Sequence, residues 1–415
     1  MDLSFILDLL VFILSLGVLV LIHELGHFLT AKLFGVYCRE FSIGMGPLIA
    51  KFKKAGGETQ FSLRAIPIGG FVSMVGEDAG DNEQAGGQLD PEKKKEEDLT
   101  EEDRKILALP KERRLDGIAK WKRLIIMAAG VIMNVVLAFL LFVGQGATSM
   151  VIDETVNYVY AEDGGVFQKS GYIEKSNIVH GSYVFVVTDA SGNTETKEKS
   201  TDFENIKEIS NFIYTINNEE FYPNSSTDHV TFTFDCIAPS EEGVYLEENK
   251  YNISFTLNVV ENEAFGSGLF YDTKNLGIAF YGRDRSFGEV IVFAAESTGE
   301  NALLIYKALG MLFTPEGLNN VGGPIAMFQM SSLAMSLGIS SFFFLWGVIS
   351  INLAVMNFLP IPGLDGWHFL VLIVEAITRK EMPKNAKNIA SMIGLILLFG
   401  LMIVITFKDI FTLIF

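Results

Sequence analysis

His23, Glu24 and His27 form a His-Glu-x-x-His motif at the end of a long apolar stretch. Residues 3–22 contain one charged side chain, Asp8, and are long enough to cross the core of a bilayer as a helix. Positions i and i+4 share one helical face, so both imidazoles can bind one Zn²⁺ while the glutamate accepts a proton from a water molecule. Ionisable groups at membrane depth are costly and usually functional. The motif therefore predicts a zinc hydrolase site built in the membrane.

A zinc site of this kind needs a third protein ligand and an open fourth position for water. His180 and His229 fall in a segment expected outside the membrane, where they cannot reach the motif. Asp365 directly follows the prolines that end the third apolar segment, at the depth where the charge bias also puts the motif. We predict Asp365 as the third ligand, and His368, three residues later, is the alternative ligand or a hydrogen-bonding partner of one.

The positive-inside rule gives the expected orientation of the chain. Basic residues crowd the approaches to the second and fourth apolar segments, and none precedes the first. Residues 35–123 and 360–388 are therefore expected in the cytoplasm, and both termini and the 148–337 segment outside. The four expected spans are about 3–33, 124–147, 338–359 and 389–407.

The expected fold is a polytopic α-helical membrane protein with about four transmembrane helices, a membrane-associated β-element and a β-rich extracytoplasmic domain. Alternating runs such as HVTFTFDCI and YNISFTLNVV favour strands in that domain. The expected parts are 1–36 (first transmembrane helix with the motif), 37–76 (cytoplasmic β region), 77–120 (charged loop), 121–148 (second transmembrane helix), 149–285 (outer domain), 286–337 (amphipathic helical connector), 338–378 (third transmembrane helix and the Asp365 segment) and 379–415 (fourth transmembrane helix).

Charge and cysteine content exclude some functions and bonds. The formal net charge of −18 argues against nucleic-acid binding. Residues 151–290 alone hold 24 acidic and 9 basic side chains, as expected of a solvated outer domain. Cys38 and Cys236 are expected on opposite sides of the membrane, so we predict no disulfide between them.

Four further polar residues lie in or near the apolar segments. Asn357 sits just before the helix break, where it could donate to a substrate carbonyl or a developing oxyanion. Asn352 is either a second substrate contact or an interhelical hydrogen-bonding group. We expect Asn134 to hold helices together and Glu375 to be structural.

Together these residues resemble the site-2 proteases, intramembrane zinc metalloproteases that include the bacterial regulator-of-sigma-E protease. The resemblance covers about 1–76, 115–140 and 320–368, and its motifs are LIHELGHFLTAKLFGV, FSIGMGP, IPIGGFVSM, VGGPIAM and NLAVMNFLPIPGLDG. It implies that His23, His27 and Asp365 bind zinc, that Glu24 is the general base and that Asn357 contacts the substrate backbone.

The resemblance also implies how substrate is bound and what the substrates are. Gly44, Gly46 and the strand Gly69–Gly70–Phe71 would belong to a β-element that dips toward the site, where an unwound substrate adds as a strand. The implied substrates are single-span proteins of the bacterial plasma membrane, such as anti-sigma factors or signal-peptide remnants. An upstream site-1-type protease would trim them first, and the outer domain would reject untrimmed ones.

Two departures from the family pattern accompany the match. Val131 stands where members carry a proline, and the outer domain is expected to be PDZ-like but lacks the usual Gly-Asp turn. Two other functions remain open from the residues alone. One is a membrane-anchored metalloprotease that acts on soluble loops, and the other is a metal-binding membrane protein, such as a transporter or sensor, without hydrolysis.

Overall fold

The computed structural model falls into two compact units, which are described separately. The membrane unit comprises Met1–Ser149 and Ser286–Phe415, and the inserted unit is Met150–Arg285. The structure describes residues 3–77, 100–153, 158–188, 194–214, 225, 227–262, 268–271, 276–311 and 322–414. Residues 78–99 of the charged loop predicted at 77–120 lie outside these residues.

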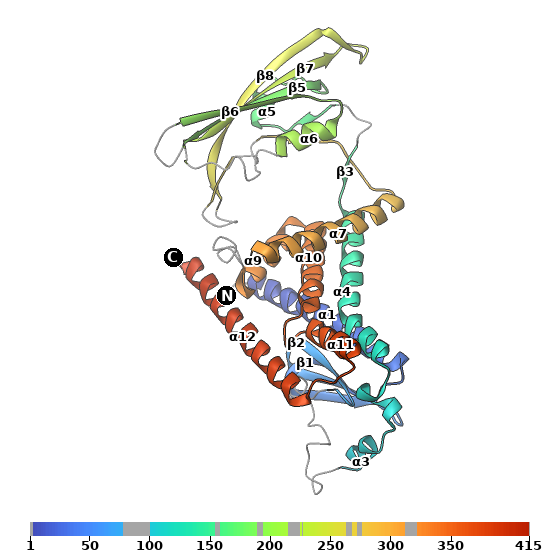
Figure 1. The fold of residues 1–415 in the computed structure, drawn as a ribbon. Coiled ribbons are helices and arrows are strands. Elements are labelled where there is room, and N and C mark those ends of the chain that lie inside the picture. The colour runs from blue at the N-terminus through green and yellow to red at the C-terminus, as the bar shows by residue number, and fades with distance from the viewer. Residues whose placement is uncertain are drawn as a thin grey trace. The chain divides into compact units, whose positions relative to one another are not determined.

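Helices build most of the membrane unit (Figure 1). They are α1 (Leu3–Leu33), α3 (Glu101–Leu107), α4 (Lys120–Thr148), α7 (Phe287–Met311), α9 (Pro324–Leu337), α10 (Ile339–Phe358), α11 (Asp365–Thr378) and α12 (Lys384–Ile414), with short 3₁₀ turns η3 (Lys111–Arg113) and η4 (Leu115–Gly117). Among the described residues, α1, α4, α10 and α12 are long and apolar enough to cross a membrane, which confirms the four predicted spans. The described residues of the predicted helical connector, 286–337, include the helices α7 and α9.

Helices α4 and α10 form the centre of the membrane unit. About a third of each span is buried (33%), against 11% for α1 and α12, whose apolar surfaces therefore need lipid around them. Small residues let α4 and α10 approach closely, because a Cβ on Gly347 of α10 would lie 2.8 Å from the ring of Phe142 on α4.

Helix α9 connects the first and last spans of the membrane unit. The carboxylate of Asp409, on α12, accepts hydrogen bonds from the backbone N–H groups of Gly323 and Ala326 at the start of α9. Ser332, on the same helix, donates to Asp8 of α1. The two bonds to Asp409 satisfy two of the backbone N–H groups that a helix N-terminus leaves without intrahelical partners.

Strands β1 (Cys38–Lys53) and β2 (Gln60–Met74) form a rolled two-stranded sheet in the membrane unit. The first part of β1 pairs with both ends of β2, so Phe41 lies opposite Val72 and also opposite Phe61. The element turns large apolar side chains outward, as expected of one that contacts lipid: Ile43, Leu48, Ile49, Phe52, Phe61, Leu63 and Ile66.

The inserted unit contains a five-stranded antiparallel sheet in the order β6-β5-β7-β8-β9, which confirms that this region is rich in strands. The strands of this sheet are β5 (Asn177–Thr188), β6 (Thr194–Asp202), β7 (His229–Pro239), β8 (Tyr245–Asn262) and β9 (Gly268–Tyr271). Two shorter pairs join β3 (Val151–Ile152) with β11 (Gly282–Arg283) and β4 (Tyr160–Ala161) with β10 (Ile278–Ala279). The unit also contains the helices α5 (Val166–Lys169) and α6 (Ile206–Tyr214). Likeness to a PDZ domain stays a prediction.

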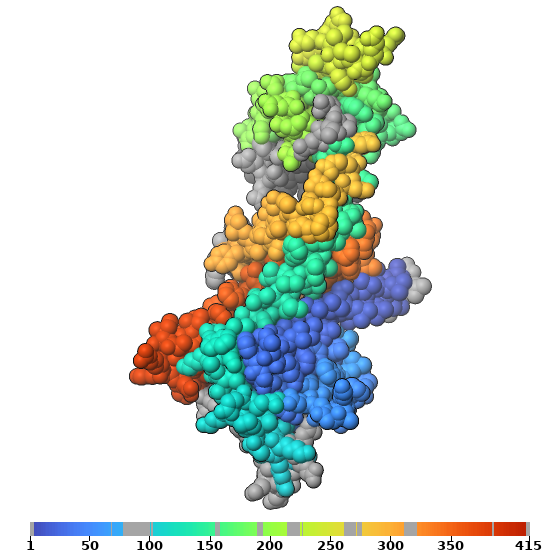
Figure 2. All heavy atoms as spheres, turned by 90° about the vertical axis from the view of Figure 1, so that its right-hand side faces the viewer, coloured from blue at the N-terminus to red at the C-terminus, as the bar shows by residue number. Residues whose placement is uncertain are grey.

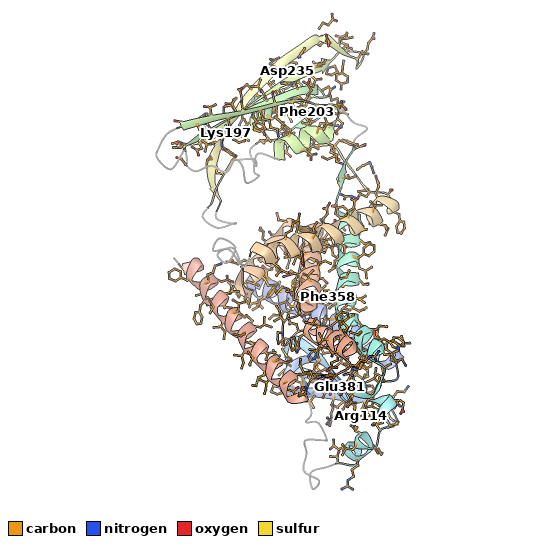
Figure 3. All side chains as sticks on the ribbon, viewed as in Figure 1. Arg114, Lys197, Phe203, Asp235, Phe358 and Glu381 are labelled. Atoms are coloured by element: carbon orange, nitrogen blue, oxygen red, sulfur yellow. The ribbon has the colours of Figure 1, made fainter. Side chains whose placement is uncertain are left out.

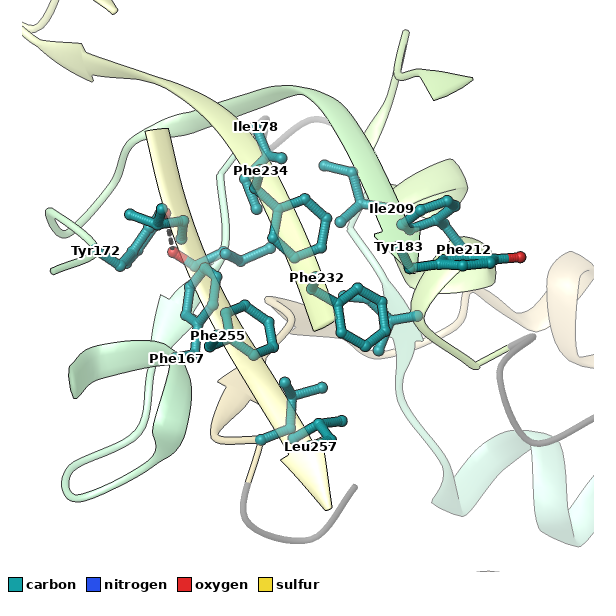
Figure 4. Packing of buried hydrophobic residues seen from close by; sticks show 14 of the residues in the cluster. Phe167, Tyr172, Ile178, Tyr183, Ile209, Phe212, Phe232, Phe234, Phe255 and Leu257 are labelled. Carbon is teal, nitrogen blue, oxygen red and sulfur yellow. Dashed lines mark hydrogen bonds between the residues drawn. The ribbon is translucent and has the colours of Figure 1, made fainter. Parts of the chain in front are cut away.

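Alternation along the strands separates an apolar and a polar face of this sheet. Phe232 and Phe234 of β7 point to the buried side, where they pack with Phe255 of β8 (Figure 4). On the other side Asp235, labelled in Figure 3, pairs with Lys250 at 3.1 Å. The core of the inserted unit is therefore made of large apolar side chains on one face of the sheet.

Candidate active site

The structure brings His23, His27 and Asp365 together. The Asp365 Oδ2 atom lies 2.9 Å from His23 Nε2 and 3.1 Å from His27 Nε2, and the two Nε2 atoms are 3.3 Å apart. In the described part of the chain these residues form a group whose ligand atoms all lie within 4.8 Å of one another. His368, the alternative third ligand, does not belong to that group.

Hydrogen bonds orient both imidazoles so that Nε2 faces the cluster. His27 Nδ1 lies 2.8 Å from the carbonyl oxygen of Ile126, which can only accept, so Nδ1 carries the proton and Nε2 keeps a lone pair. His23 Nδ1 lies 3.1 Å from the side-chain amide of Asn134, whose Oδ1 is buried and has no hydrogen-bond partner among the described residues. With the amide turned over, Oδ1 accepts from His23 Nδ1–H, and both imidazoles offer Nε2 to a metal.

Two glycines allow α4 to lie directly against the histidines. A Cβ on Gly130 would lie 2.3 Å from His27 Nε2 and 2.8 Å from His23 Nε2. A Cβ on Gly26 would lie 2.4 Å from the carbonyl oxygen of Ala129. The cluster thus occupies a cradle that any side chain at position 130 would fill.

The turn between α10 and α11 places Asp365 beside His23 and His27. Helix α10 ends at Phe358, labelled in Figure 3, whose ring lies 5.7 Å from that of Phe369 on α11. Pro360 and Pro362 cannot continue a helix, and α11 then begins at Asp365. Gly366 must lack a side chain, because a Cβ there would lie 2.2 Å from the carbonyl oxygen of Leu359.

Glu24 lies between the histidines and the edge of the β-element. The backbone N–H of Val72 donates a hydrogen bond to its carboxylate, and a Cβ on Gly70 would lie 3.7 Å from its Cγ. Figure 2 shows α1 and the β1–β2 element side by side, as their residue contacts also indicate. The edge of β2 therefore runs past the carboxylate that the sequence predicts as the general base.

The other predicted site residues differ in their distance from the cluster. Asn357 Nδ2 lies 3.5 Å from His23 Nε2, so this amide borders the site. Asn352 has an exposed side chain and no hydrogen bond to the cluster in the described part of the chain. The side chain of Asn134 on α4 contacts His23 on α1, so it joins two helices as expected, but the sequence did not reveal that its partner is a histidine of the motif. Ser350 of α10 donates to the backbone carbonyl oxygen of Asn134. Glu375 pairs with Lys387 at 2.8 Å, away from the site.

The glycines and Phe71 of the β-element lie where they shape its turns and its edge. Gly44, Gly46 and Gly69 have φ values of +82°, +80° and +91°, which side-chain-bearing residues rarely adopt. A Cβ on Gly70 would lie 2.7 Å from the carbonyl oxygen of Ser42, so this residue is needed for close pairing of the strands. Phe71 is buried next to it.

These observations fit a zinc ion. Two imidazole nitrogens and one carboxylate oxygen are a donor set typical of hydrolytic zinc sites, in which the fourth position stays open for water. The cradle at Gly130 and the two imidazole tautomers match such a site as well. Fold and site together are those of a metal-dependent hydrolase whose candidate metal-binding residues lie on or beside helices that can span a membrane.

Comparison with known proteins identifies the family. The family model of peptidase family M50 matches residues 11–401, and the chain belongs to this family. The regulator of sigma-W protease RasP of Bacillus subtilis is 27% identical over 463 residues, covering 98% of this chain and 99% of the relative. A relative from Clostridium perfringens that bears a zinc metalloprotease name is 28% identical over 405 residues, covering 96% and 97%.

The family assignment confirms the predicted resemblance to the site-2 proteases. The chain is a zinc metalloprotease and a multi-pass membrane protein. A relative from Clostridium acetobutylicum with a similar name is 29% identical over 399 residues, covering 96% of each chain. These relatives match along nearly their full lengths, so the inserted unit lies within the shared region.

Proposed function

We propose that the chain hydrolyses peptide bonds in or next to transmembrane segments of other membrane proteins. In this proposal His23, His27 and Asp365 hold the zinc and Glu24 is the general base. The proposal rests on His23, His27 and Asp365, whose possible ligand atoms all lie within 4.8 Å of one another. The two histidines are on a helix that can span a membrane, and Asp365 follows the end of another such helix. A carboxylate that is not a ligand lies beside that cluster, which metal binding alone would not require.

The residues divide the chemistry among them. Zinc held by these three residues would act as a Lewis acid, lowering the pKa of a water molecule and polarising the scissile carbonyl. Glu24 accepts a proton from that water as its oxygen bonds to the carbonyl carbon. Glu24 then gives the proton to the leaving nitrogen as the C–N bond breaks. Asn357 donates its amide N–H to the oxygen on which negative charge develops.

Substrate would reach these groups in extended form. The carbonyls of a helical substrate are tied in i→i−4 hydrogen bonds, so the segment must unwind before water can attack. The edge of β2 at Gly70 lies beside Glu24, where an extended chain can add as a strand. We place substrate along this edge.

The decisive experiment compares cleavage of a purified single-span membrane protein by wild type and by Glu24→Gln. Glu24→Gln should keep about one zinc per chain and lose about 100- to 10,000-fold in activity. His23→Ala, His27→Ala and Asp365→Ala should lose the metal as well. His180→Ala is the control, because that histidine pairs with Asp202 in the inserted unit.

Two results would contradict this assignment. Zinc binding without cleavage of any substrate would favour the metal-binding protein without hydrolysis. Cleavage confined to soluble loops would favour the membrane-anchored protease.

The proposed location is the bacterial plasma membrane, with both termini and the inserted unit outside and the β-element associated with the cytoplasmic side of the membrane. The native thiols are poor probes of this orientation, because Cys38 and Cys236 are buried and burial raises the pKa of each to about 12. Cysteines introduced at exposed Lys54 and Glu247 are better. In sealed cells an impermeant maleimide should label Glu247→Cys and spare Lys54→Cys. Labelling in the reverse order would overturn the orientation.

The proposed substrates are single-span membrane proteins, anti-sigma factors and signal-peptide remnants among them. The name of the Bacillus subtilis relative, regulator of sigma-W protease, supports a role of this kind. We further propose that an upstream protease trims the outer part of each substrate, and that the inserted unit rejects substrates that are still untrimmed.

A further inference from the structure

We propose that Arg64 is a positioning residue for substrate. Its buried guanidinium fixes the strand edge beside Glu24, and in this way determines how well an extended substrate segment is bound. The inference rests on the proposed function, since it concerns the edge along which substrate is placed there.

The guanidinium is the centre of a hydrogen-bond network inside the β-element. Arg64 is 6% exposed and donates to Glu40 Oε1 at 2.7 Å, to Ser42 Oγ at 3.0 Å and to the carbonyl oxygen of Gly46 at 2.8 Å. Ser42 Oγ in turn donates to the carbonyl oxygen of Gly44 at 3.2 Å. Arg64 is therefore hydrogen-bonded directly to Gly46, and through Ser42 to Gly44, the two glycines of β1 that have positive φ.

The same side chain supports the strand that faces the site. The Arg64 guanidinium carbon lies 5.2 Å from the centre of the Phe71 ring, within the range of a cation–π contact. The residue after Phe71 is Val72, whose N–H donates to Glu24. Backbone groups of alternate residues point to the same edge of a strand, so Gly70 faces Glu24 as well. Any shift of Phe71 moves both the substrate-binding edge and a hydrogen-bonding partner of Glu24.

The buried ion pair lies in an element that turns much of its apolar surface outward. Ile49 and Phe52 are 64% and 67% exposed, whereas Glu40 and Arg64 are 0% and 6% exposed. In water, a strand's register is fixed by burying one apolar face, but here only part of the apolar surface, including Phe41 and Phe71, is buried. A planar guanidinium with five donors in fixed directions can specify the pairing instead, and the flexible ammonium of lysine cannot.

Stability alone does not account for this pair. Replacing both members of a buried ion pair by apolar residues is often neutral or stabilising, whereas removing one member leaves an unpaired buried charge. The double variant Glu40→Leu/Arg64→Met is therefore expected to fold. It loses the hydrogen bonds to Ser42 and to the Gly46 carbonyl, so it separates folding from positioning.

The experiment measures kcat, KM and zinc content for wild type, the double variant and Arg64→Lys with one purified single-span substrate in detergent. The double variant should retain zinc, and KM should rise by about 10- to 100-fold with a smaller fall in kcat. Arg64→Lys keeps the charge without the planar fork and should give an intermediate KM. Glu58→Gln is the matched control, because it removes a carboxylate from the ion pairs with Lys32 and Arg113 at the far end of the strands.

Binding of the same substrate is then measured in a Glu24→Gln background, where no cleavage interferes. The double variant should weaken that binding by the same factor as it raises KM. An unchanged KM and unchanged binding in a folded, zinc-loaded double variant would overturn the role of Arg64. Failure of wild type itself to cleave, with Glu24→Gln indistinguishable from it, would instead overturn the proposed function.

Discussion

Both units bury clusters of apolar side chains, but they differ in what else they enclose. The membrane unit encloses His23, His27 and Asn134 in one hydrogen-bonded group, and the helices around that group meet at glycines. The inserted unit encloses a cluster of aromatic and aliphatic side chains, and its two histidines lie at the surface. In the first unit, small residues permit contact between backbones and polar groups. In the second, large apolar residues make the contacts themselves.

A substitution near the histidines is therefore expected to change the chemistry, whereas one in the core of the inserted unit is expected to change the stability. A methyl group added near the histidines meets the proposed ligand atoms, whereas truncation of a core side chain costs transfer and cavity free energy.

Gly130→Ala should remove most of the bound zinc and lower activity by about 100-fold or more. The reason is steric, since the new Cβ would lie 2.3 Å from His27 Nε2. Zinc per chain by elemental analysis and initial cleavage rates are the measurements. Gly400→Ala on α12 is the control, because its Cβ would meet nothing within 4 Å. A zinc-loaded, active Gly130→Ala enzyme would show that α4 does not press on the ligands.

Removal of the inserted unit should leave the chemistry intact and widen the range of substrates. Strands β3 and β11 pair, and the N–H of Asp153 donates to the carbonyl oxygen of Tyr281 at 2.8 Å, so an Asn-Gly turn can replace 154–280. The shortened enzyme should cleave a trimmed substrate within about threefold of the wild-type rate, because all proposed catalytic residues lie in the membrane unit. It should also cleave an untrimmed substrate that wild type rejects.

Initial rates on both substrates, with zinc content as the check on folding, decide this prediction. Total loss of activity on the trimmed substrate in a zinc-loaded variant would assign the inserted unit a role in presenting substrate. Continued rejection of the untrimmed substrate would refute its role as a filter.

The smallest effect is expected at Glu58, in the turn between β1 and β2. Burial opposes ionisation of this carboxyl, but hydrogen bonds from Arg113 and Lys32 outweigh it and lower the pKa. A lowered folded-state pKa stabilises the protein above the unfolded value near 4.5 and loses that contribution as pH falls through the folded value. At pH 7, Glu58→Gln should cost about 0.5 kcal/mol or less, since the group is partly exposed.

Thermal unfolding of both proteins across pH 3 to 7 provides the measurement. The difference between wild type and Glu58→Gln should shrink as the pH drops below about 4.5. A difference that grows toward low pH would reverse the sign of the effect.

Much of the membrane unit could be predicted from the sequence. Apolar length and composition located the four spans, and the fixed i, i+4 spacing put His23 and His27 on one face. Asp365 was predictable because two prolines end the preceding helix. The contact of Asn134 with His23 was not, because a helix of uniformly apolar surface carries no periodic signal for which side faces its neighbour. For the same reason, the sequence did not show which side of its helix Asn352 occupies, and the structure has its side chain exposed.

The β-element shows a second limit. Its glycines and prolines predicted turns, but nothing in the sequence indicates that Arg64 and Glu40 are buried while apolar residues such as Ile49 and Phe52 are exposed. Strand patterns are interpreted on the assumption that apolar residues face a core, and that assumption fails where lipid is the surrounding medium. The signal that was available was a lone basic residue between apolar neighbours in FSLRAIP.

The cap of α9 also has a consequence for biosynthesis. The amides of Gly323 and Ala326 are bonded by Asp409, which is translated after all of α9, α10 and α11. A nascent chain therefore carries an uncapped helix start until α12 has been made and inserted. The hydrogen bonds that join the first and last spans through α9 can therefore form only after α12 has been synthesised.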